Sequence, residues 1–242
     1  MLIYGIHPVS EALRAGRVRQ IRVARREDDR LRRLVNDAES RGVPVERVSI
    51  DVLDREARHG VHQGVVATVL ERPVFTLADL VHSDAGPPLI VVLDGIEDPQ
   101  NVGAILRTVD AAGATGVVRQ TRRAAPLDGA AAKASAGAVN HVPVAEVVNI
   151  ARAIEELKTA GVWTVGLDAE GKTPYYELDL ATPTAIVLGA EGSGLRRLVR
   201  ERCDFVAAIP MAGHVKSLNV SAAAAIVLFD AVRQRRSRGR LG

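Results

Sequence analysis

Two polar segments, about a hundred residues apart along the chain, hold most of the side chains that could do chemistry. Each follows a run of apolar residues and precedes a stretch with helical periodicity, which predicts a strand end, a loop and a helix start. Open parallel sheets bind ligands at this place, outside the carboxyl ends of their strands. Polar groups concentrated there predict a functional site instead of a scaffold. They are Asp94, Asp98, Asn101, Arg107, Ser217 and Asn219.

A third segment, residues 189–194, is rich in glycine and directly follows the apolar run 186–188. A glycine-rich turn lets backbone amides approach a ligand closely, although a plain turn would have the same composition. The chain has no GxxxxGK[ST] phosphate loop, no GxGxxG after the apolar run 89–93 and no GxSxG elbow. These absences argue against a P-loop nucleotide enzyme, a conventional dinucleotide-binding turn and an α/β-hydrolase.

The composition argues against several other classes. The single cysteine, Cys203, leaves neither an internal disulfide nor a thiolate metal cage, and the six histidines lack a metal-binding spacing, so we expect no metal. No apolar run reaches the roughly 18 residues of a membrane span, and the N-terminus has no signal-peptide pattern, so we expect a cytoplasmic protein without membrane contact. The net charge of +3 is compatible with a polyanionic partner, but 3% aromatic residues argue against base stacking as its main contact.

Apolar patterning predicts two α/β parts joined by a linker. Residues 1–70 form a small α/β domain, and residues 71–88, with three prolines and weak periodicity, form the linker. The elements expected in the first part are a helix at 8–14, a strand at 20–24, a helix with the apolar stripe Leu31, Leu34, Val35 and Ala38, an extended run at 43–50, a helix capped by Asp51 that ends at Ala57, and a strand at 65–69.

Residues 89–242 form the second part. Strand and helix alternate along it, which predicts an α/β domain with a parallel sheet. The run 89–93 is apolar throughout, as expected for a central parallel strand. The further predicted strands are residues 116–118, 142–144, 162–167, 185–188 and 205–209, and the predicted helices are residues 101–112, 150–160 and 220–235.

Three segments of the second part also carry a family resemblance. They are DGIEDPQNVGAILR at 94–107, LGAEGSGL at 188–195 and IPMAGHVKSLNVS at 209–221. In order and spacing they resemble the three motifs of the SpoU/TrmH family of RNA ribose 2′-O-methyltransferases. YGIHPV at 4–9 and HQGVVA at 62–67 are similar to the substrate-binding domain of one subfamily, which methylates a guanosine in the peptidyl-transferase P-loop of 23S rRNA. The resemblance covers essentially the whole chain.

The resemblance implies a methyl transfer from S-adenosylmethionine to a ribose 2′-hydroxyl of 23S rRNA. It also implies a deep trefoil knot that holds the cofactor, and a homodimer with the site near its interface. By motif match, the polar catalytic residues would be Asn101, Arg107, Glu191, Ser217 and Asn219. The adenosine pocket would be lined by Gly189, Ile209 and Leu218, with Leu167 as a weaker candidate.

Each of these side chains also has a purely structural interpretation. Asn101 could cap the helix that starts beside it, Glu191 could be solvated, and Arg107 could form a surface ion pair. Ser217 and Asn219 could close a turn through bonds to the backbone, and Asp94 and Asp98 are expected to shape their loop. A guanidinium essentially never loses its proton, so Arg107 is better suited to bind a phosphate or stabilise an alkoxide than to act as a base. Asn140 and Ala124 depart from residues that are common in the family.

Basic residues predict where RNA would bind. We expect phosphate contacts from Arg14, Arg22, Arg25, Arg26, Arg122 and Arg123. The alternative is that many of them pair with Glu27, Asp28 and Asp29 or are only solvated. Two other functions stay open: an RNA methyltransferase with a tRNA or another rRNA nucleotide as target, and a non-catalytic RNA-binding assembly module.

Overall fold

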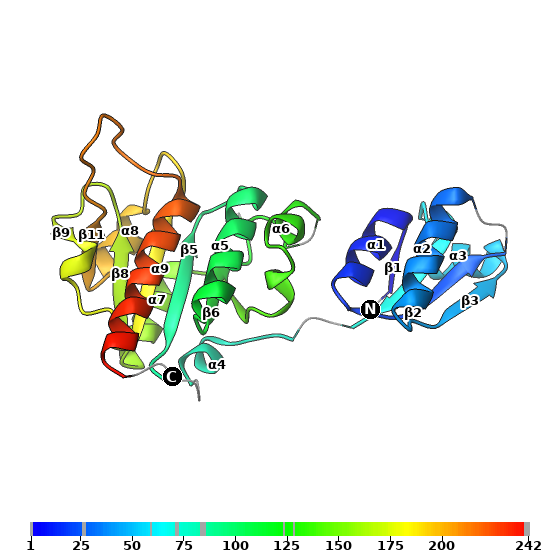
Figure 1. Ribbon diagram of the computed structural model, residues 1–242, viewed down its shortest axis with the longest axis horizontal. Helices are drawn as coiled ribbons and strands as arrows, with labels where there is room; N and C mark the ends of the chain where they lie inside the picture. The colour runs from blue at the N-terminus through cyan, green and yellow to red at the C-terminus, as the bar shows by residue number, and fades with distance from the viewer. Residues whose placement is uncertain are drawn as a thin grey trace. The chain divides into compact units, whose positions relative to one another are not determined.

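A computed structural model describes residues 2–25, 28–58, 60–70, 73–82, 86–122, 124–127 and 129–239. The chain divides into two compact units, Met1–Arg72 and Pro73–Gly242 (Figure 1). Each unit has a sheet and a hydrophobic core of its own. None of the helices in the described ranges combines the length and the apolar character that a bilayer crossing requires.

The first unit is a four-stranded sheet in the order β1-β4-β2-β3, with only β2 and β3 parallel. Helices α1 and α2 cover one face through residues such as Leu13 and Leu34, and α3 covers the other through Leu53. The elements are β1 (Leu2–Tyr4), α1 (Ile6–Arg14), β2 (Val18–Ala24), α2 (Asp29–Ser40), β3 (Val45–Val48), α3 (Ile50–Glu56) and β4 (Val65–Val69).

The predicted apolar stripe of α2 is confirmed, because all four of its residues are buried. The predicted cap of α3 is wrong. This helix begins at Ile50 with Ser49 in the N-cap position, so Asp51 lies inside its first turn. The sequence does not predict β1, because three residues are too few for a period to be visible.

The second unit is built on a seven-stranded sheet in which all neighbouring strands are parallel, so the predicted parallel sheet is confirmed. The strand order is β7-β6-β5-β10-β8-β11-β9. Every residue of β5 is buried, as its apolar run predicts. The strands are β5 (Leu89–Asp94), β6 (Gly116–Gln120), β7 (Val144–Val147), β8 (Trp163–Leu167), β9 (Thr173–Pro174), β10 (Thr184–Gly189) and β11 (Phe205–Ala208).

Strand β7 starts later than the predicted strand at 142–144. The Val142 amide donates to the Ala138 carbonyl and closes a turn, so the chain becomes extended only at Val144. Strand β9 has two residues and leaves no periodic signal in the sequence.

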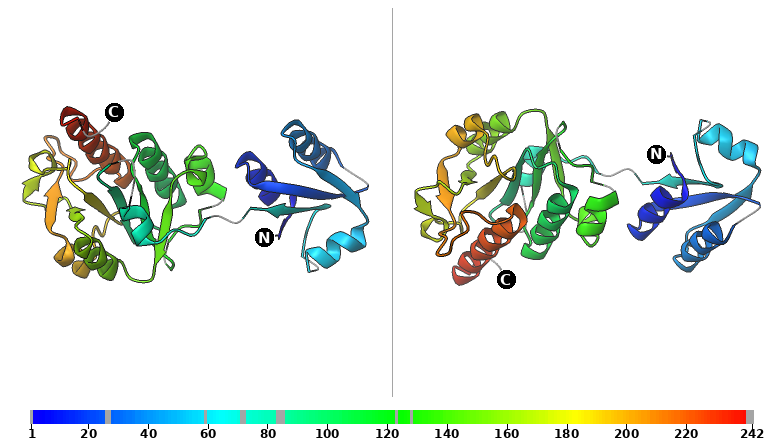
Figure 2. Two further views of the ribbon diagram at one scale, coloured as in Figure 1. Left: turned by 90° about the horizontal axis from the view of Figure 1, so that it is seen from below. Right: turned by 90° about the horizontal axis from the view of Figure 1, so that it is seen from above.

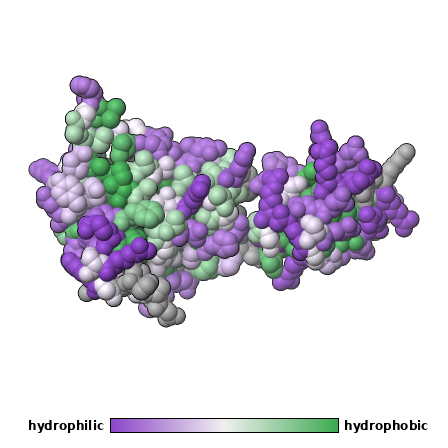
Figure 3. Space-filling view, in the orientation of Figure 1, coloured by the Kyte–Doolittle hydropathy of each residue, from purple (hydrophilic) through white to green (hydrophobic). Residues whose placement is uncertain are grey.

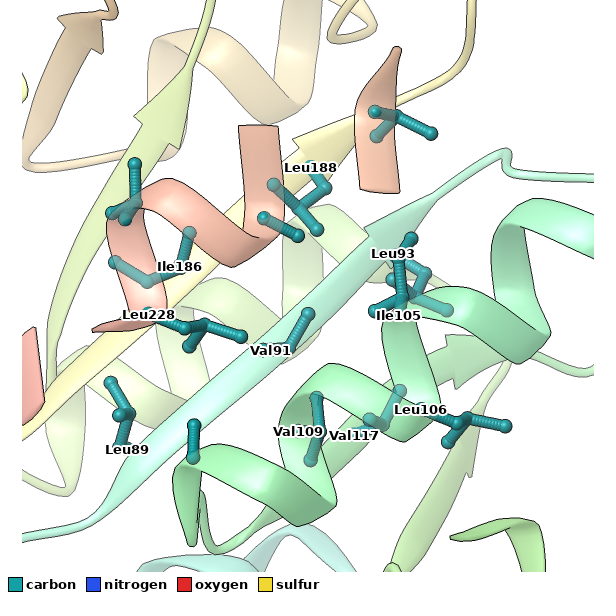
Figure 4. Packing of buried hydrophobic residues seen from close by; sticks show 14 of the residues in the cluster. Leu89, Val91, Leu93, Ile105, Leu106, Val109, Val117, Ile186, Leu188 and Leu228 are labelled. Carbon is teal, nitrogen blue, oxygen red and sulfur yellow. The ribbon is translucent and has the colours of Figure 1, made fainter. Parts of the chain in front are cut away.

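Helices cover both faces of this sheet (Figures 1 and 2). Within β5, Leu89, Val91 and Leu93 pack in one core and Ile90 and Val92 in the other. Figure 4 shows the first core, where Val91 and Ile186 lie with Leu228 of α9 and Val109 of α5. Its helices are α5 (Pro99–Ala112) and α9 (Val220–Ser237), and those of the opposite face are α4 (Leu77–Val81), α7 (Ile150–Thr159) and α8 (Arg197–Arg202).

Helix α4 corrects the extent of the predicted linker. It lies within residues 71–88, is capped by reciprocal hydrogen bonds between Thr76 and Asp79, and buries Leu80 in the core of the second unit. Residues 73–82 therefore belong to that unit. A helix of five residues is too short to show a helical period, and the prolines around it suggest a loop.

The C-terminal end of α9 is held by a buried arginine. Arg235 is 4% exposed and its guanidinium donates to the carbonyl oxygens of Leu180, Thr182, Pro87 and Pro88. These carbonyls belong to the segments that enter β5 and β10, so one side chain joins the last helix to the start of two central strands.

We expect the substitution Arg235→Met to destabilise the second unit by roughly 3 kcal/mol, because it leaves buried carbonyl groups without donors. Urea unfolding followed by the fluorescence of Trp163, the one tryptophan of the chain, measures this unit. Arg236→Met, at an exposed position of the same helix, is the matched control and should change stability by less than about 0.5 kcal/mol. Equal stability of the two variants would contradict the conclusion that Arg235 holds the end of α9 to the start of β5 and β10.

Candidate active site

Side chains from three distant parts of the chain meet at the carboxyl edge of the parallel sheet. The Asn219 amide donates from Nδ2 to Asn101 Oδ1 at 2.9 Å and to Glu191 Oε1 at 2.7 Å. Its Oδ1 accepts from the amide and the hydroxyl of Ser221, at 2.8 and 2.6 Å. One side chain therefore links the start of α5, the glycine-rich turn after β10 and the start of α9. We call Asn101, Glu191 and Asn219 the polar cluster.

Helix α5 places Asn101 in this cluster. Asp98 is the N-cap and accepts from the amides of Gln100 and Asn101, while Pro99 occupies the first helical position, where its missing N–H costs nothing. The interpretation of Asn101 as the cap is therefore wrong. Asn101 lies in the first turn, 6% exposed, with its side chain directed to Asn219.

Asn219 combines a structural and a site role. It is the N-cap of α9, accepting from the Ser221 amide, and it contacts the other two members of the polar cluster with its Nδ2. The turn-forming interpretation of Asn219 is thus correct but incomplete.

The glycine-rich turn folds back tightly on the end of β10. Ala190 and Gly194 exchange backbone hydrogen bonds of 3.1 and 2.9 Å, and Gly192 and Gly194 have positive φ. A Cβ added to Gly189 would lie 2.2 Å from the backbone carbon of Gly194, so only glycine fits. The turn presents Glu191 to Asn219, which contradicts the interpretation of Glu191 as merely solvated.

A cavity of about 600 Å³ lies beside the polar cluster. All four predicted cofactor residues line it: Leu167 at the end of β8, Gly189 at the end of β10, Ile209 just after β11, and Leu218. Glu191, Ser217 and Asn219 also line it. The cavity therefore occupies the place where parallel sheets bind ligands, and its size is that of a pocket for a small molecule.

Some lining residues escape the sequence analysis. Asp168 and Glu170 line the cavity and lie 3.8 and 3.5 Å from the guanidinium of Arg200, which also lines it. The two acids directly follow a predicted strand, so the rule about carboxyl ends could have identified them. Arg200 lies on α8, a short helix for which the sequence gives no clear period.

Arg107 is not part of this arrangement. It is exposed on α5, six residues after Asn101 and therefore about 9 Å further along the helix, and it does not line the cavity. Within the described part of the chain it has no ion-pair or hydrogen-bond partner, so a surface ion pair does not explain it. The structure thus unites three of the five predicted catalytic residues, places Ser217 in the cavity wall and leaves Arg107 outside.

Both aspartates of the first polar segment shape their loop. Asp98 caps α5, and Asp94, which is completely buried, accepts from the backbone amide and the Nε of Arg196 at 2.8 and 2.6 Å. The expectation of a structural role for the two is confirmed.

The predicted RNA-contacting arginines differ in their surroundings. Arg22 pairs with Glu46 at 3.0 Å and with Glu56, and hydrogen bonding to Glu46 raises the pKa of Arg22. Its guanidinium is therefore held by two carboxylates. Arg25 and Arg122 are exposed, whereas Arg26 and Arg123 lie outside the described residues.

The acidic residues expected to neutralise these arginines have other partners. Asp28 caps α2, Asp29 pairs with Arg32, and Arg14 pairs with Glu11. Glu27 lies outside the described residues.

The two departures from the family pattern lie away from the cavity. Asn140 donates to the Gly137 carbonyl, and its Oδ1 is buried without a hydrogen-bond partner among the described residues. Neither Asn140 nor Ala124 lines the cavity. In the described ranges, no group of three or more His, Cys, Asp or Glu side chains is arranged to hold a metal ion.

Fold and cavity define a class of protein: a parallel α/β unit whose ligand pocket is made by loops at the carboxyl edge, preceded in the chain by a small α/β unit. Residues 88–229 match the SpoU rRNA Methylase family, and residues 2–73 match the family described as RNA 2′-O ribose methyltransferase substrate binding. The chain belongs to the SpoU rRNA methylase family, as its three motifs predict.

Similar curated proteins cover almost the whole chain. The 23S rRNA (guanosine-2′-O-)-methyltransferase RlmB of Pseudomonas syringae pv. tomato is 44% identical over 239 residues, which are 96% of this chain and 95% of that protein. An uncharacterized tRNA/rRNA methyltransferase of Mycolicibacterium gilvum is 44% identical over 97% of this chain and 77% of its own length.

Similar solved structures include complexes with AdoMet. The SpoU methyltransferase AviRb from Streptomyces viridochromogenes, in complex with AdoMet, has a TM-score of 0.68 and 31% identity, covering 98% of this chain and 91% of that chain. The AdoMet-bound rRNA methyltransferase from Sinorhizobium meliloti has a TM-score of 0.67 and 29% identity, covering 96% and 86%.

The substitution Gly189→Ala tests the pocket. We expect at least about tenfold weaker binding of S-adenosylmethionine by calorimetry, because the new Cβ must displace the backbone of the turn. Gly213→Ala is the control, since a Cβ there would have no neighbour within 4 Å. If both variants bound the cofactor as the parent protein does, the cavity would not be its site.

Proposed function

We propose that this protein transfers a methyl group from S-adenosylmethionine to the ribose 2′-hydroxyl of a guanosine in the peptidyl-transferase P-loop of 23S rRNA. The observation that carries the proposal is the polar cluster at the wall of the cavity, built from all three family motifs. The similarity to 23S rRNA (guanosine-2′-O-)-methyltransferases over 96% of the chain indicates the substrate.

The residues of the cavity fit S-adenosylmethionine. The volume of the cavity suits a ligand of this size, and apolar groups of Leu167, Ile209 and Leu218 can enclose the adenosine. The tight turn at Gly189 lets backbone groups approach the ligand. When bound, the sulfonium supplies an activated methyl group, so the chain needs neither a metal nor an activated phosphate. Its own task is chiefly to align the ribose hydroxyl.

The polar cluster, Ser217 and Arg107 have different roles in this alignment. Asn219 fixes Glu191 and Asn101 relative to each other, which sets the part of the cavity wall that Glu191 and Asn219 line. Glu191 and Ser217 offer the ribose hydroxyls hydrogen-bond partners at this wall. We assign Arg107 to an RNA phosphate or to the alkoxide that develops as the hydroxyl loses its proton, because a guanidinium keeps its own proton.

We further propose that the pocket is enclosed by a deep trefoil knot and that the protein is a homodimer. The strand order supports the knot, because β10 enters between β5 and β8 although β8 precedes it in the chain. Ile226 and Phe229, 36% and 49% exposed on α9, support the dimer, and Figure 3 shows apolar surface gathered over this helix. Arg107 is exposed on α5, which packs beside α9, and it lies outside the cavity of its own chain.

We assign RNA binding to residues 1–70 and methyl transfer to the second unit, in which residues 73–82 pack with the predicted domain 89–242. The match of residues 2–73 to a substrate-binding family supports this role. The exposed Arg25, and Arg14 with its single surface ion pair, are available for phosphates, whereas Arg22 is held by two acids.

A tRNA, or another rRNA nucleotide, is the second candidate substrate. The observation that favours it is the 44% identity to the tRNA/rRNA methyltransferase of Mycolicibacterium gilvum, whose name leaves the RNA open.

The function is tested by methyl transfer from radiolabelled S-adenosylmethionine to unmethylated 23S rRNA, with the modified nucleotide mapped by reverse-transcription stops. We expect a single 2′-O-methylguanosine in the P-loop. A mark at another nucleotide, or on tRNA alone, would support the second candidate. Bound cofactor without transfer to either RNA would overturn the proposal in favour of a non-catalytic assembly module.

We expect Arg107→Ala to lower the single-turnover rate by more than about 100-fold, the scale of removing one preorganised charge donor. S-adenosylmethionine binding should stay close to that of the parent protein, because Arg107 does not line the cavity. Arg152→Ala removes an exposed arginine from α7 on the other face of the sheet and serves as control. Near-normal methylation by the Arg107 variant would contradict the assignment of Arg107 to an RNA phosphate or to the alkoxide.

A further inference from the structure

Arg196 occupies an unusual place next to the glycine-rich turn. It lies two residues after the turn, and its backbone amide and side chain both donate to Asp94, which ends β5 and pairs in the ladder with Gly189. Asp94 is completely buried, whereas the Arg196 side chain is 47% exposed. The pair thus reaches from the sheet interior to the surface at the edge where the cavity opens.

The contacts fix the direction of the guanidinium. Nε donates to Asp94 at 2.6 Å and Nη2 donates to Gln120 Oε1 at 2.9 Å, so the side chain is held from two strands. Its Nη1 group has no partner among the described residues. The Nε and Nη2 groups of the guanidinium are therefore bonded within the protein. The Nη1 group is left for a ligand, and the internal bonds already fix the side-chain rotamer.

Stability alone does not explain this arrangement. Asp94 loses its hydration on burial, and pairing such a carboxylate with a half-exposed guanidinium is often no more stabilising than apolar residues of similar volume would be. A preordered guanidinium, by contrast, loses little side-chain freedom when it binds a phosphate, and its planar fork matches phosphate oxygens. The exposed Arg122 lies two residues after Gln120, the last residue of β6. Arg119, also on β6, forms an ion pair of 3.3 Å with Glu146.

We propose that Arg196 binds a phosphate of the substrate RNA beside the methylated nucleotide, and that Asp94 is a positioning residue that aims it. The inference rests on the proposed function, since it requires RNA at this edge of the sheet. It also gives a role to a motif-one aspartate that does not itself line the cavity.

The test separates a phosphate contact from simple neutralisation of Asp94. Arg196→Gln leaves a buried charge without its partner and is expected to lower Tm. The double variant Asp94→Asn with Arg196→Gln removes both charges and keeps an acceptor for the backbone amide, so it should regain Tm and bind S-adenosylmethionine within about threefold of the parent protein. Arg196→Lys keeps the charge, and Arg197→Gln removes a neighbouring arginine that pairs with Glu201 on the surface.

The decisive measurement is the affinity of each variant for a 23S rRNA transcript at several salt concentrations. We expect the double variant to bind about five- to tenfold more weakly, with the slope of log affinity against log salt reduced by about one phosphate contact. Arg196→Lys should retain the slope, and Arg197→Gln should lower it less than the double variant. Parental affinity and slope in the double variant would overturn the proposal, because the guanidinium would then serve Asp94 alone.

Failure of this inference is distinguishable from failure of the proposed function. RNA binding is measured without turnover, and methyl transfer is measured on the parent protein. A parent protein that methylates rRNA, together with a double variant of unchanged salt slope, would leave the enzyme activity in place and remove only the role of Arg196.

Discussion

The side-chain amide of Asn219 is the contact on which the site depends. With two donated and two accepted hydrogen bonds it joins the start of α5, the glycine-rich turn after β10 and the start of α9. Because the amide uses both N–H groups and its oxygen, a shift of any one segment breaks at least one bond. The pocket wall is therefore a property of three loops acting together.

The parallel sheet makes this convergence possible. Strands β5, β10 and β8 are neighbours in parallel register, so Asp94, Gly189 and Leu167 all lie at the same edge. The sheet is buried on both faces, which favours strands as apolar as β5, and the polar cluster is built at the loops and helix starts beyond the strand ends. Tight packing at this edge also determines residue types: position 189 must be glycine, because the turn leaves no room for a Cβ.

Local signals in the sequence account for much of this fold. The apolar stripe of α2, the uniform burial of β5 and the helix after Asp98 follow from periodicity and capping chemistry. Short elements such as α4 and β9 do not, because a few residues cannot display a period. The partners of charged groups also escape prediction: Arg22 is paired with Glu46 and Glu56, far along the chain from the acids that follow it directly.

The sequence by itself determined the family, the parallel α/β class of the second unit and the residues of the three motifs, because motif residues and apolar periods can be read from the order of residues alone. Only the tertiary structure decided that Asn101 faces Asn219 instead of capping its helix, that Arg107 lies outside the cavity of its own chain, and that Asp94 is buried against Arg196. Such facts depend on strand order and on loop closure between distant segments. No local pattern specifies which side chains these bring together.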